Sequence, residues 1–362
     1  MSKYHLTFLL NHSQGSLMNS LINSDPDLFI KCEPNEFLYE VSNAIHRLIN
    51  NNCDGKLRKM ALKHFESKGK MLRPMFIRDL ALSMNLDLAL VLPWAVTCEI
   101  LHNATLIHDD LQDGDEVRRG RPTTWKEYGF EQAINLGDFL LIIAPQSLIR
   151  SPLGCKNELL HLFSVMSSKV VGGQVEEFEL NKLETEHNLY QKYLDCITGK
   201  TSSLFAGLAV GVGLIADAPR DTLTSLESVF LQLGHIFQIQ DDILDFYGNK
   251  QRGEKGCDIK EGKVSYLIVN YLERNPNDFD VISRILRKSR AETNQIDFQT
   301  IEKLFNKNNN LEFCLDHLER RVDELRSSPI FVSNSVLYNL VNSLTDKILE
   351  PTREISSVQV EA

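Results

Sequence analysis

Two runs of apolar residues with helical spacing each end in a cluster of aspartates. The run LHNATLIH precedes DDLQD at residues 109–113, and LGHIFQIQ precedes DDILD at residues 241–245. Positions i and i+4 of a helix lie on one face, so the first and last aspartates of each cluster are neighbours. The chain must therefore fold in a way that accommodates two acidic turns, each at the end of an apolar helix.

Two such clusters predict a divalent metal site. Three carboxylates within one turn repel one another, and burial raises their pKa values unless a cation lies between them. Mg²⁺ suits them because it takes one or two protein carboxylates and completes its octahedron with water and phosphate oxygens. A single cluster is more often a solvated helix end, but two clusters after apolar helices favour a site. The candidate ligands are Asp109, Asp110, Asp113, Asp241, Asp242 and Asp245.

The rest of the chain is also helical in pattern. From Phe37 onward most segments place apolar residues at i, i+3 and i+4, which predicts amphipathic or buried helices. Alternating strand patterns and Asn-Gly hairpins are missing, so we predict an all-α protein. Polar stretches with glycine or proline at 114–124, 151–157 and 246–263 interrupt the helices without separating two cores. We therefore expect a single helical domain at 36–350, a variable leader at 1–35 and a tail at 351–362.

Composition excludes several other classes. The formal charge of −10 argues against a nucleic-acid partner, because such proteins need a basic face. Seven cysteines without a CxxC pair predict reduced thiols of a cytoplasmic protein. The longest apolar run, LFAGLAVGVGLIA at 204–216, is shorter than the roughly 20 residues that a bilayer demands. We therefore expect no transmembrane segment, and we expect the glycines of this run to let a neighbouring helix come close.

A metal ion at the aspartates could hold one diphosphate. Basic residues that accompany the aspartates could bind a second one. The segment GKMLRP carries Lys70 and Arg73, which are three residues apart and are expected on one helix face. Arg118 and Arg119 follow the first cluster and can fold back over it, and His102 could add a donor. Arginine suits bidentate phosphate recognition, whereas lysine acts as a point charge. A Lys-Arg pair alone is usually a surface feature, so the order of these residues relative to the aspartates carries the prediction.

The joint order of these motifs resembles the trans-isoprenyl (polyprenyl) diphosphate synthases. The resemblance runs from about residue 69 to 267 through GKMLRP, LIHDDLQDGDEVRRGRPT, AINLGD, GGQVEEFEL, GKTSSLFA, FQIQDDILD and KGCDIKEGK. It implies antiparallel helices around a deep central cavity with the two aspartate motifs facing each other at its mouth. It also implies a homodimer and a Mg²⁺-dependent prenyltransferase, with a trio of ions per active site, that extends an allylic diphosphate with isopentenyl diphosphate.

The resemblance further implies roles for single residues. Asp109, Asp113 and Asp241 would be the principal Mg²⁺ ligands, and the other three aspartates would support them. The residues implied for the allylic diphosphate are Arg118, Lys200 and Lys263, those for isopentenyl diphosphate are Lys70, Arg73, His102 and Arg119, and those that direct oxygens toward the allylic cation are Lys200, Thr201 and Gln238.

Some positions depart from the family pattern. Met71 replaces a frequent arginine, which puts the shape of the isopentenyl diphosphate site in doubt. Glu177 stands where aspartate is frequent after Gln174. Gln174 itself is a further candidate for substrate binding. In the glycine-rich loop Glu254 occupies the place of an expected lysine, and Lys255, one position on, is a candidate replacement.

The expected reaction begins with metal-assisted ionisation of the allylic C–O bond. The double bond of isopentenyl diphosphate then attacks the cation in an apolar cavity that excludes water. A class I terpene cyclase of similar fold would use the same ionisation and close the cation on itself, without an isopentenyl diphosphate site. A non-catalytic regulatory subunit would be expected to lose an aspartate cluster, and both are intact here.

Small residues before the first cluster predict a long product. Ala104 and Thr105 stand five and four residues before Asp109, where a bulky aromatic would block the growing tail. Leu101 and Cys98 come next on that face, about 5.4 Å deeper per turn. We predict geranylgeranyl diphosphate or a longer product rather than farnesyl diphosphate. The alternative is that Ala104 only packs against a neighbouring helix.

Overall fold

The computed structural model describes residues 32–360 apart from 68, 184–186 and 249–255. The described residues form helices joined by short turns, so the predicted all-α class is confirmed. Most of the predicted leader lies outside the described residues, and the first described helix begins at Phe37.

The elements in the first half of the chain are α2 (Phe37–Asn52), α3 (Gly55–Glu66), α4 (Leu72–Ser83), α5 (Leu88–Asp113), β1 (Val117–Arg118), β2 (Arg121–Pro122), α6 (Thr124–Tyr128), α7 (Phe130–Ile143), α8 (Gln146–Ile149) and α9 (Lys156–Asn181). Those in the second half are α10 (Leu189–Ile197), the π-helical turn η2 (Thr198–Ser202), α11 (Ser203–Ile215), α12 (Arg220–Tyr247), α13 (Cys257–Lys260), α14 (Tyr266–Arg274), the 3₁₀ turn η3 (Pro276–Asp278), α15 (Phe279–Leu286), α16 (Gln295–Lys307), α17 (Asn310–Arg326), α18 (Ile330–Ser333) and α19 (Ser335–Val360).

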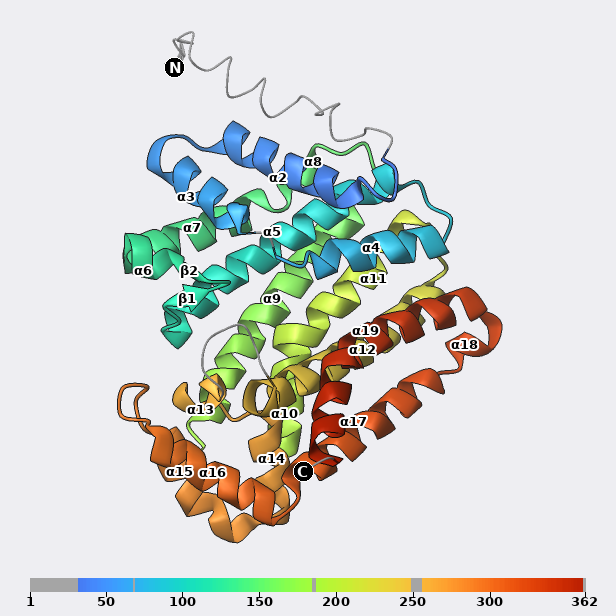
Figure 1. The fold of residues 1–362 in the computed structure, drawn as a ribbon. Coiled ribbons are helices and arrows are strands. Elements are labelled where there is room, and N and C mark those ends of the chain that lie inside the picture. Colours follow the sequence, from blue (N-terminus) through green and yellow to red (C-terminus); the bar gives the residue numbers. More distant parts are fainter. Residues whose placement is uncertain (1–31, 68, 184–186, 249–255, 361–362) are drawn as a thin grey trace, which may run out of the picture.

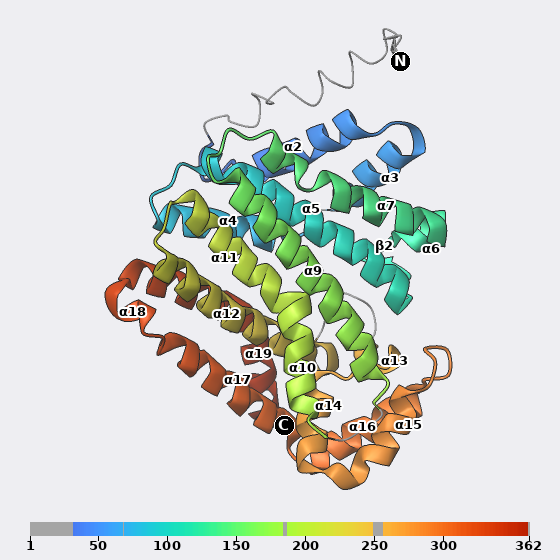
Figure 2. The ribbon, with the colours of Figure 1, turned by 180° about the vertical axis from the view of Figure 1, so that it is seen from behind.

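The long helices α5, α9, α11 and α12 run through the middle of the molecule (Figures 1 and 2). Helix α11 packs against α4, α5, α9 and α12, and most of its side chains are buried. Helices α2 and α3 cover one end, while α14, α15 and α16 lie at the other (Figure 1). Both helices that end in aspartate clusters, α5 and α12, therefore belong to the central group.

Glycines of α11 allow its neighbours to approach closely. A Cβ atom on Gly211 would lie 2.1 Å from Nε1 of Trp94 in α5, and one on Gly207 would lie 2.3 Å from Sδ of Met166 in α9. Trp94 is fully buried and donates a hydrogen bond to the carbonyl of Leu208 at 3.2 Å. A side chain at either glycine would displace a neighbouring side chain, so the predicted close approach is confirmed.

Three helical stretches are long and apolar enough to cross a membrane, judged by length and composition: Leu88–Asp113, Phe130–Ile149 and Leu189–Ile215. In the first and third, 78% and 72% of the most apolar window is buried inside the protein, so these helices form its core. The second is 44% buried and keeps a more exposed apolar side. The expected absence of a transmembrane segment stays a prediction.

Two local features differ from the sequence-based expectations. The stretch at 114–124 contains a short hairpin in which Val117 pairs with Pro122, and its turn is made by Arg119 (φ 53°) and Gly120 (φ 74°). Two positive φ values are typical of two-residue hairpin turns. Helix α19 continues past residue 350 and buries Thr352, so the predicted boundary of the tail falls inside this helix.

Candidate active site

The first aspartate cluster forms the last turn of α5. The partly exposed side of this helix carries His102, Thr105, Asp109 and Asp113, spaced by three or four residues. Asp110 lies on the other side and is only 3% exposed. Burial raises the pKa of Asp109, as does the neighbouring Asp113 carboxylate, while a nearby lysine lowers it. The two outer carboxylates are thus the ones available to a ligand.

The hairpin folds Arg118 back onto the helix end, as predicted, whereas Arg119 reaches the residues before α4. Arg118 donates from Nε to the buried Asp110 carboxylate. Burial still raises the pKa of Asp110 to about 6, although Arg118 lowers it. Arg119 donates to the carbonyl of Ser67 at 3.0 Å, and its guanidinium leaves no room for a Cβ atom on Gly69. The hairpin therefore joins the first aspartate turn to the GKMLRP segment.

Lys200 is held in the π-helical turn between α10 and α11. Such insertions are often found at functional sites. A Cβ atom on Gly173 of α9 would lie 2.2 Å from the Lys200 backbone nitrogen, so this turn lies directly on α9. The Lys200 ammonium pairs with Glu177. Burial alone would lower the pKa of Lys200, but the Asp109 and Glu177 carboxylates raise it.

Asp242, the second of the three aspartates in the second cluster, accepts hydrogen bonds from other groups of the protein. Asp242 receives hydrogen bonds from Gln238 Nε2 (2.8 Å), the Tyr193 hydroxyl (2.8 Å) and the backbone N–H of Tyr266 (2.7 Å). Burial raises its pKa to about 6, although these donors lower it. The hydroxyl of Thr201 donates to Gln238 Oε1 at 2.8 Å. Asp242 therefore supports the site by orienting Gln238, and these bonds connect the π turn to the second cluster.

Lys263 ties the segment after the second cluster to the first cluster. Its Nζ lies 2.8 Å from Oδ2 of Asp113 and 2.6 Å from Oε2 of Glu261. Asp245 accepts a hydrogen bond from the backbone N–H of Asp258 at 3.0 Å, which holds α13 against the end of α12. Burial alone would lower the pKa of Lys263, but the Asp113 and Glu261 carboxylates raise it well above its ordinary value. The structure thus brings the regions of the two clusters together.

The basic motif has a different geometry from the predicted one. Met71 adopts a left-handed conformation (φ 45°) and α4 begins only at Leu72. Lys70 therefore precedes the helix and is exposed, whereas Arg73 lies in the first turn. The prediction that these two residues share a helix face is wrong, because the left-handed Met71 caps α4 and leaves Lys70 outside the helix.

Arg73 is nevertheless suited to bind an anion. Burial lowers its pKa to about 10, so it stays charged at neutral pH. Its Nε is buried and has no hydrogen-bond partner within the described residues. A buried donor without a partner is costly, and a phosphate oxygen would satisfy it.

A buried polar chain near Arg73 was missed in the sequence. His64 Nε2 lies 3.0 Å from Oδ1 of Asn103, whose Nδ2 donates to Oε1 of Glu99 at 3.1 Å. Burial raises the pKa of Glu99, although Arg73 lowers it. Burial and the nearby arginines lower the pKa of His102 well below its ordinary value, so it is a neutral donor. The sequence signal for this chain is the pair of polar residues Glu99 and Asn103, which stand four positions apart within an apolar helix.

The remaining predicted residues lie as follows. Gln174 donates to the side-chain carbonyl of Gln112 at 3.1 Å, so it contacts the first aspartate turn from α9. Ala104 and Leu101 are buried, at 0% and 1% exposure, whereas Thr105 is partly exposed. Lys255 lies outside the described residues.

The donor set fits Mg²⁺ when substrate oxygens complete it. In the described part of the chain, no three His, Cys, Asp or Glu side chains lie close enough to hold a metal ion alone. Mg²⁺ usually takes only one or two protein carboxylates together with water and phosphate oxygens. Asp109 and Asp113 lie on the accessible side of α5 and can supply these two. Asp241 is partly exposed on α12.

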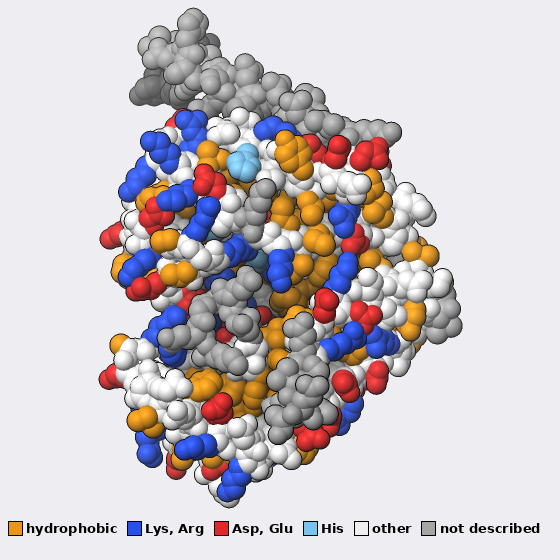
Figure 3. Space-filling view, viewed as in Figure 1, with side chains coloured by type: hydrophobic (Ala, Val, Ile, Leu, Met, Phe, Trp, Pro, Cys, Tyr) orange, Lys and Arg blue, Asp and Glu red, His pale blue; other side chains and the backbone are white. Residues whose placement is uncertain are grey.

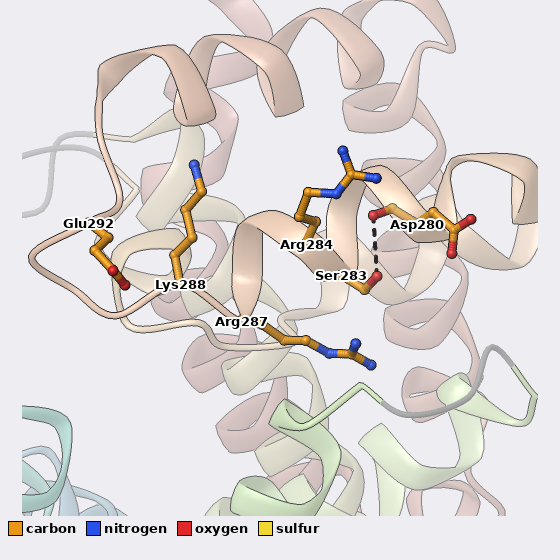
Figure 4. A pocket seen from close by; sticks show the side chains of 6 residues that line it. All are labelled: Asp280, Ser283, Arg284, Arg287, Lys288 and Glu292. Carbon is orange, nitrogen blue, oxygen red and sulfur yellow. Dashed lines mark hydrogen bonds between the residues drawn. The ribbon is translucent and has the colours of Figure 1, made fainter.

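The molecular surface agrees with this location. The face in Figure 3 is hollowed in its middle, where hydrophobic side chains lie beside lysine and arginine side chains. A separate pocket on α15 (Figure 4) is lined by Asp280, Ser283, Arg284, Arg287, Lys288 and Glu292. Two of its cations are already engaged, because Arg287 donates to the carbonyl of Leu183 and Lys288 pairs with Asp297. That pocket contains none of the predicted site residues.

Helices that present two aspartate turns beside buried lysine and arginine groups define a class of enzymes acting on diphosphates. The chain belongs to the polyprenyl synthetase family, whose sequence profile matches residues 54–304. The predicted family is thereby confirmed.

Relatives and solved structures agree with this assignment. A short chain isoprenyl diphosphate synthase of Methanocaldococcus jannaschii is 34% identical over 62% of this chain and 69% of its own length. A geranylgeranyl diphosphate synthase of Saccharolobus solfataricus is 29% identical over 82% of this chain and 91% of its own length. The crystal structure of a geranylgeranyl pyrophosphate synthase shares the fold, with a TM-score of 0.77 and 22% identity over 88% of this chain and 98% of that one.

The substitution Gly173→Ala should displace the π turn. A methyl group there would meet the Lys200 backbone, so we expect a loss of about 1–3 kcal/mol in unfolding free energy and weaker Mg²⁺-dependent binding of inorganic diphosphate. Gly154→Ala is the control, because its added Cβ atom would meet nothing within 4 Å. Urea unfolding and calorimetry measure both effects, and equal behaviour of the two variants would contradict the prediction.

Proposed function

We propose that this protein is a trans-prenyltransferase that condenses an allylic diphosphate with isopentenyl diphosphate. The observation that carries the proposal is that the hairpin joins two different anion-binding sets, because Arg118 bonds to Asp110 and Arg119 bonds to the carbonyl of Ser67. One consists of the Asp109 and Asp113 carboxylates with Lys200 and Lys263, and it suits a metal-bound diphosphate. The other contains Arg73, whose buried Nε has no partner among the described residues, and it suits a second diphosphate. The names of the relatives support the same reaction.

The allylic half of the reaction belongs to the first set. Mg²⁺, when bound, would supply Lewis-acid stabilisation of the departing diphosphate. Lys200 and Lys263 hold the diphosphate, and both ammonium groups stay charged because their pKa values are raised. The Thr201 hydroxyl and the Gln238 amide present oxygens to the allylic cation, and the apolar helices around them exclude water.

The second set distinguishes elongation from cyclisation. A class I terpene cyclase acts on a single diphosphate and has no use for a second site. The second diphosphate site consists of Arg73, the neutral donor His102 and Arg119, which contacts the start of the GKMLRP segment. The presence of these residues supports elongation.

A direct assay tests the proposal. Purified protein with Mg²⁺, isopentenyl diphosphate and allylic diphosphates of several lengths should give longer diphosphates, identified by mass, and a chelator should abolish turnover. Asp109→Asn should lower kcat/KM at least about a hundredfold, whereas Asp54→Asn, whose side chain is 92% exposed, should not. A hydrocarbon formed without isopentenyl diphosphate would indicate a cyclase, and no turnover would indicate a non-catalytic subunit.

We further propose a product of twenty carbons or more. Thr105 is the small residue on the accessible side of α5, one turn before Asp109, so the growing tail has room there. Ala104 is fully buried in the hydrophobic core instead. Relatives include both geranylgeranyl and farnesyl diphosphate synthases, so this side chain, and not membership of the family, supports the longer product.

Phenylalanine at these two positions should have different effects. Thr105→Phe should shorten the product by about one isoprene unit, roughly the length of one helical turn, without loss of stability. Ala104→Phe should overpack the core and cost about 1–3 kcal/mol. Product analysis by mass and thermal unfolding measure the two effects. An unchanged product distribution for Thr105→Phe would mean that this face of α5 does not limit chain length.

We also propose that two copies of the chain associate through α7 and α9. These helices lie on the same side of the molecule (Figure 2). Their outward side exposes large apolar residues, which mark protein interfaces when they gather: Phe130, Ile134, Ile142, Val165, Val171, Val175 and Phe178.

A single charge should disrupt this association. Ile142→Asp places a carboxylate in the proposed interface, and the expected result is a shift from dimer to monomer in light scattering. Ile296→Asp on α16 is the control, because Ile296 is 71% exposed, much like Ile142 at 68%, but lies on another helix. A monomeric native protein, or a dimeric Ile142→Asp variant, would contradict the proposal.

A further inference from the structure

Arg290 reaches the first aspartate turn from a distant part of the chain. It lies in the loop between α15 and α16, and its Nη1 donates to the carbonyl of Asp113 at 2.9 Å and to Oδ1 of Asp115 at 3.0 Å. Asp113 is the last residue of a 26-residue helix, so the helix itself provides no partner for this carbonyl. A cation at this point also opposes the negative end of the helix dipole. Arg290 therefore caps α5.

The cap is part of a closed ring of hydrogen bonds and ion pairs. Oε1 of Glu261 lies 3.7 Å from Nη1 of Arg290, and Oε2 lies 2.6 Å from Nζ of Lys263. Lys263 in turn lies 2.8 Å from the Asp113 carboxylate. The Glu261 side chain is only 5% exposed, so these interactions are poorly screened by water. The ring joins the end of α5 to the segment after α13 and to the α15–α16 loop.

The two cations of the ring contact different parts of Asp113. Lys263 pairs with one oxygen of the carboxylate and would share or exchange it if a metal ion bound there. Arg290 bonds to the backbone carbonyl and to Asp115, so its contacts leave the carboxylate available. The end of α5 can therefore keep its position while the Asp113 side chain exchanges partners.

We propose that Arg290 is a positioning residue of the allylic diphosphate site. It clamps the end of α5 so that Asp109 and Asp113 stay where a metal-bound diphosphate can reach them. This inference rests on the proposed function, because it concerns the same site. None of the motifs by which the sequence resembles the family includes Arg290.

The test compares Arg290→Ala, Arg290→Lys and Arg284→Ala. Arg284 is exposed on α15 (Figure 4) and makes no hydrogen bond or ion pair with any described residue, so it is a matched control. Calorimetry measures binding of inorganic diphosphate at several Mg²⁺ concentrations, and hydrogen exchange measures opening of the amides at 114–119. Steady-state kinetics give KM for each substrate.

Arg290→Ala should weaken Mg²⁺-dependent diphosphate binding about tenfold, the usual effect of a lost hydrogen bond to a charged group. It should raise KM for the allylic substrate, leave KM for isopentenyl diphosphate unchanged and speed exchange at 114–119. Arg290→Lys keeps the charge without the planar fork, so it should lie between Arg290→Ala and the native protein. Arg284→Ala should match the native protein.

The inference is overturned if Arg290→Ala and Arg284→Ala behave alike in binding and in exchange. If Arg290→Ala does not fold, Arg290→Lys decides the question by the same two readouts. A native protein that fails to bind diphosphate with Mg²⁺ would refute the proposed function, while hydrogen exchange would still show whether Arg290 holds the end of α5.

Discussion

The carboxylates at the ends of the apolar helices are buried, and the arrangement of the site depends on the cations and hydrogen-bond donors that compensate their charge. An ionised carboxylate away from water is costly unless a cation or hydrogen-bond donors accompany it. In the first cluster Arg118 pairs with Asp110 and Lys263 pairs with Asp113, and the nearby Lys200 charge lowers the pKa of Asp109. These cations come from three different segments, so the compensation of one helix end links it to the hairpin, to the π turn and to the segment after α13.

The same ion pairs explain how one site can hold both metal and diphosphate. Lys200 pairs with Glu177, and Lys263 pairs with both Asp113 and Glu261. Metal ions alone would add positive charge beside these ammonium groups, and diphosphate alone would add negative charge beside the carboxylates. Bound together, they balance each other and let each lysine turn from a carboxylate to a phosphate. Binding of metal and of diphosphate should therefore favour each other, and such coupling is reciprocal.

Local patterns predicted most of this site but not all of it. Apolar spacing identified the two aspartate-terminated helices, and closeness in sequence predicted that Arg118 folds back over the first cluster, where it pairs with Asp110. The left-handed Met71 was not predictable, because periodicity does not show where a helix starts, and it separates Lys70 from Arg73. The cap by Arg290 joins residues 177 positions apart, so no local signal could reveal it. Sequence patterns indicate which face of a helix is buried, but not which distant loop will meet its end.

Backbone packing, rather than charge, determines where Lys200 lies. A Cβ atom on Gly173 of α9 would lie 2.2 Å from the Lys200 nitrogen, and one on Gly234 of α12 would lie 2.5 Å from Cα of Ser202. The π turn is thus held between two helices at positions where neither side can carry a side chain. Ion pairs alone could be satisfied by a flexible lysine in many geometries, because the ammonium group is a point charge on a long stem. Glycine contacts restrict the backbone first, and Glu177 and Asp109 then act on an ammonium group whose attachment point is already fixed.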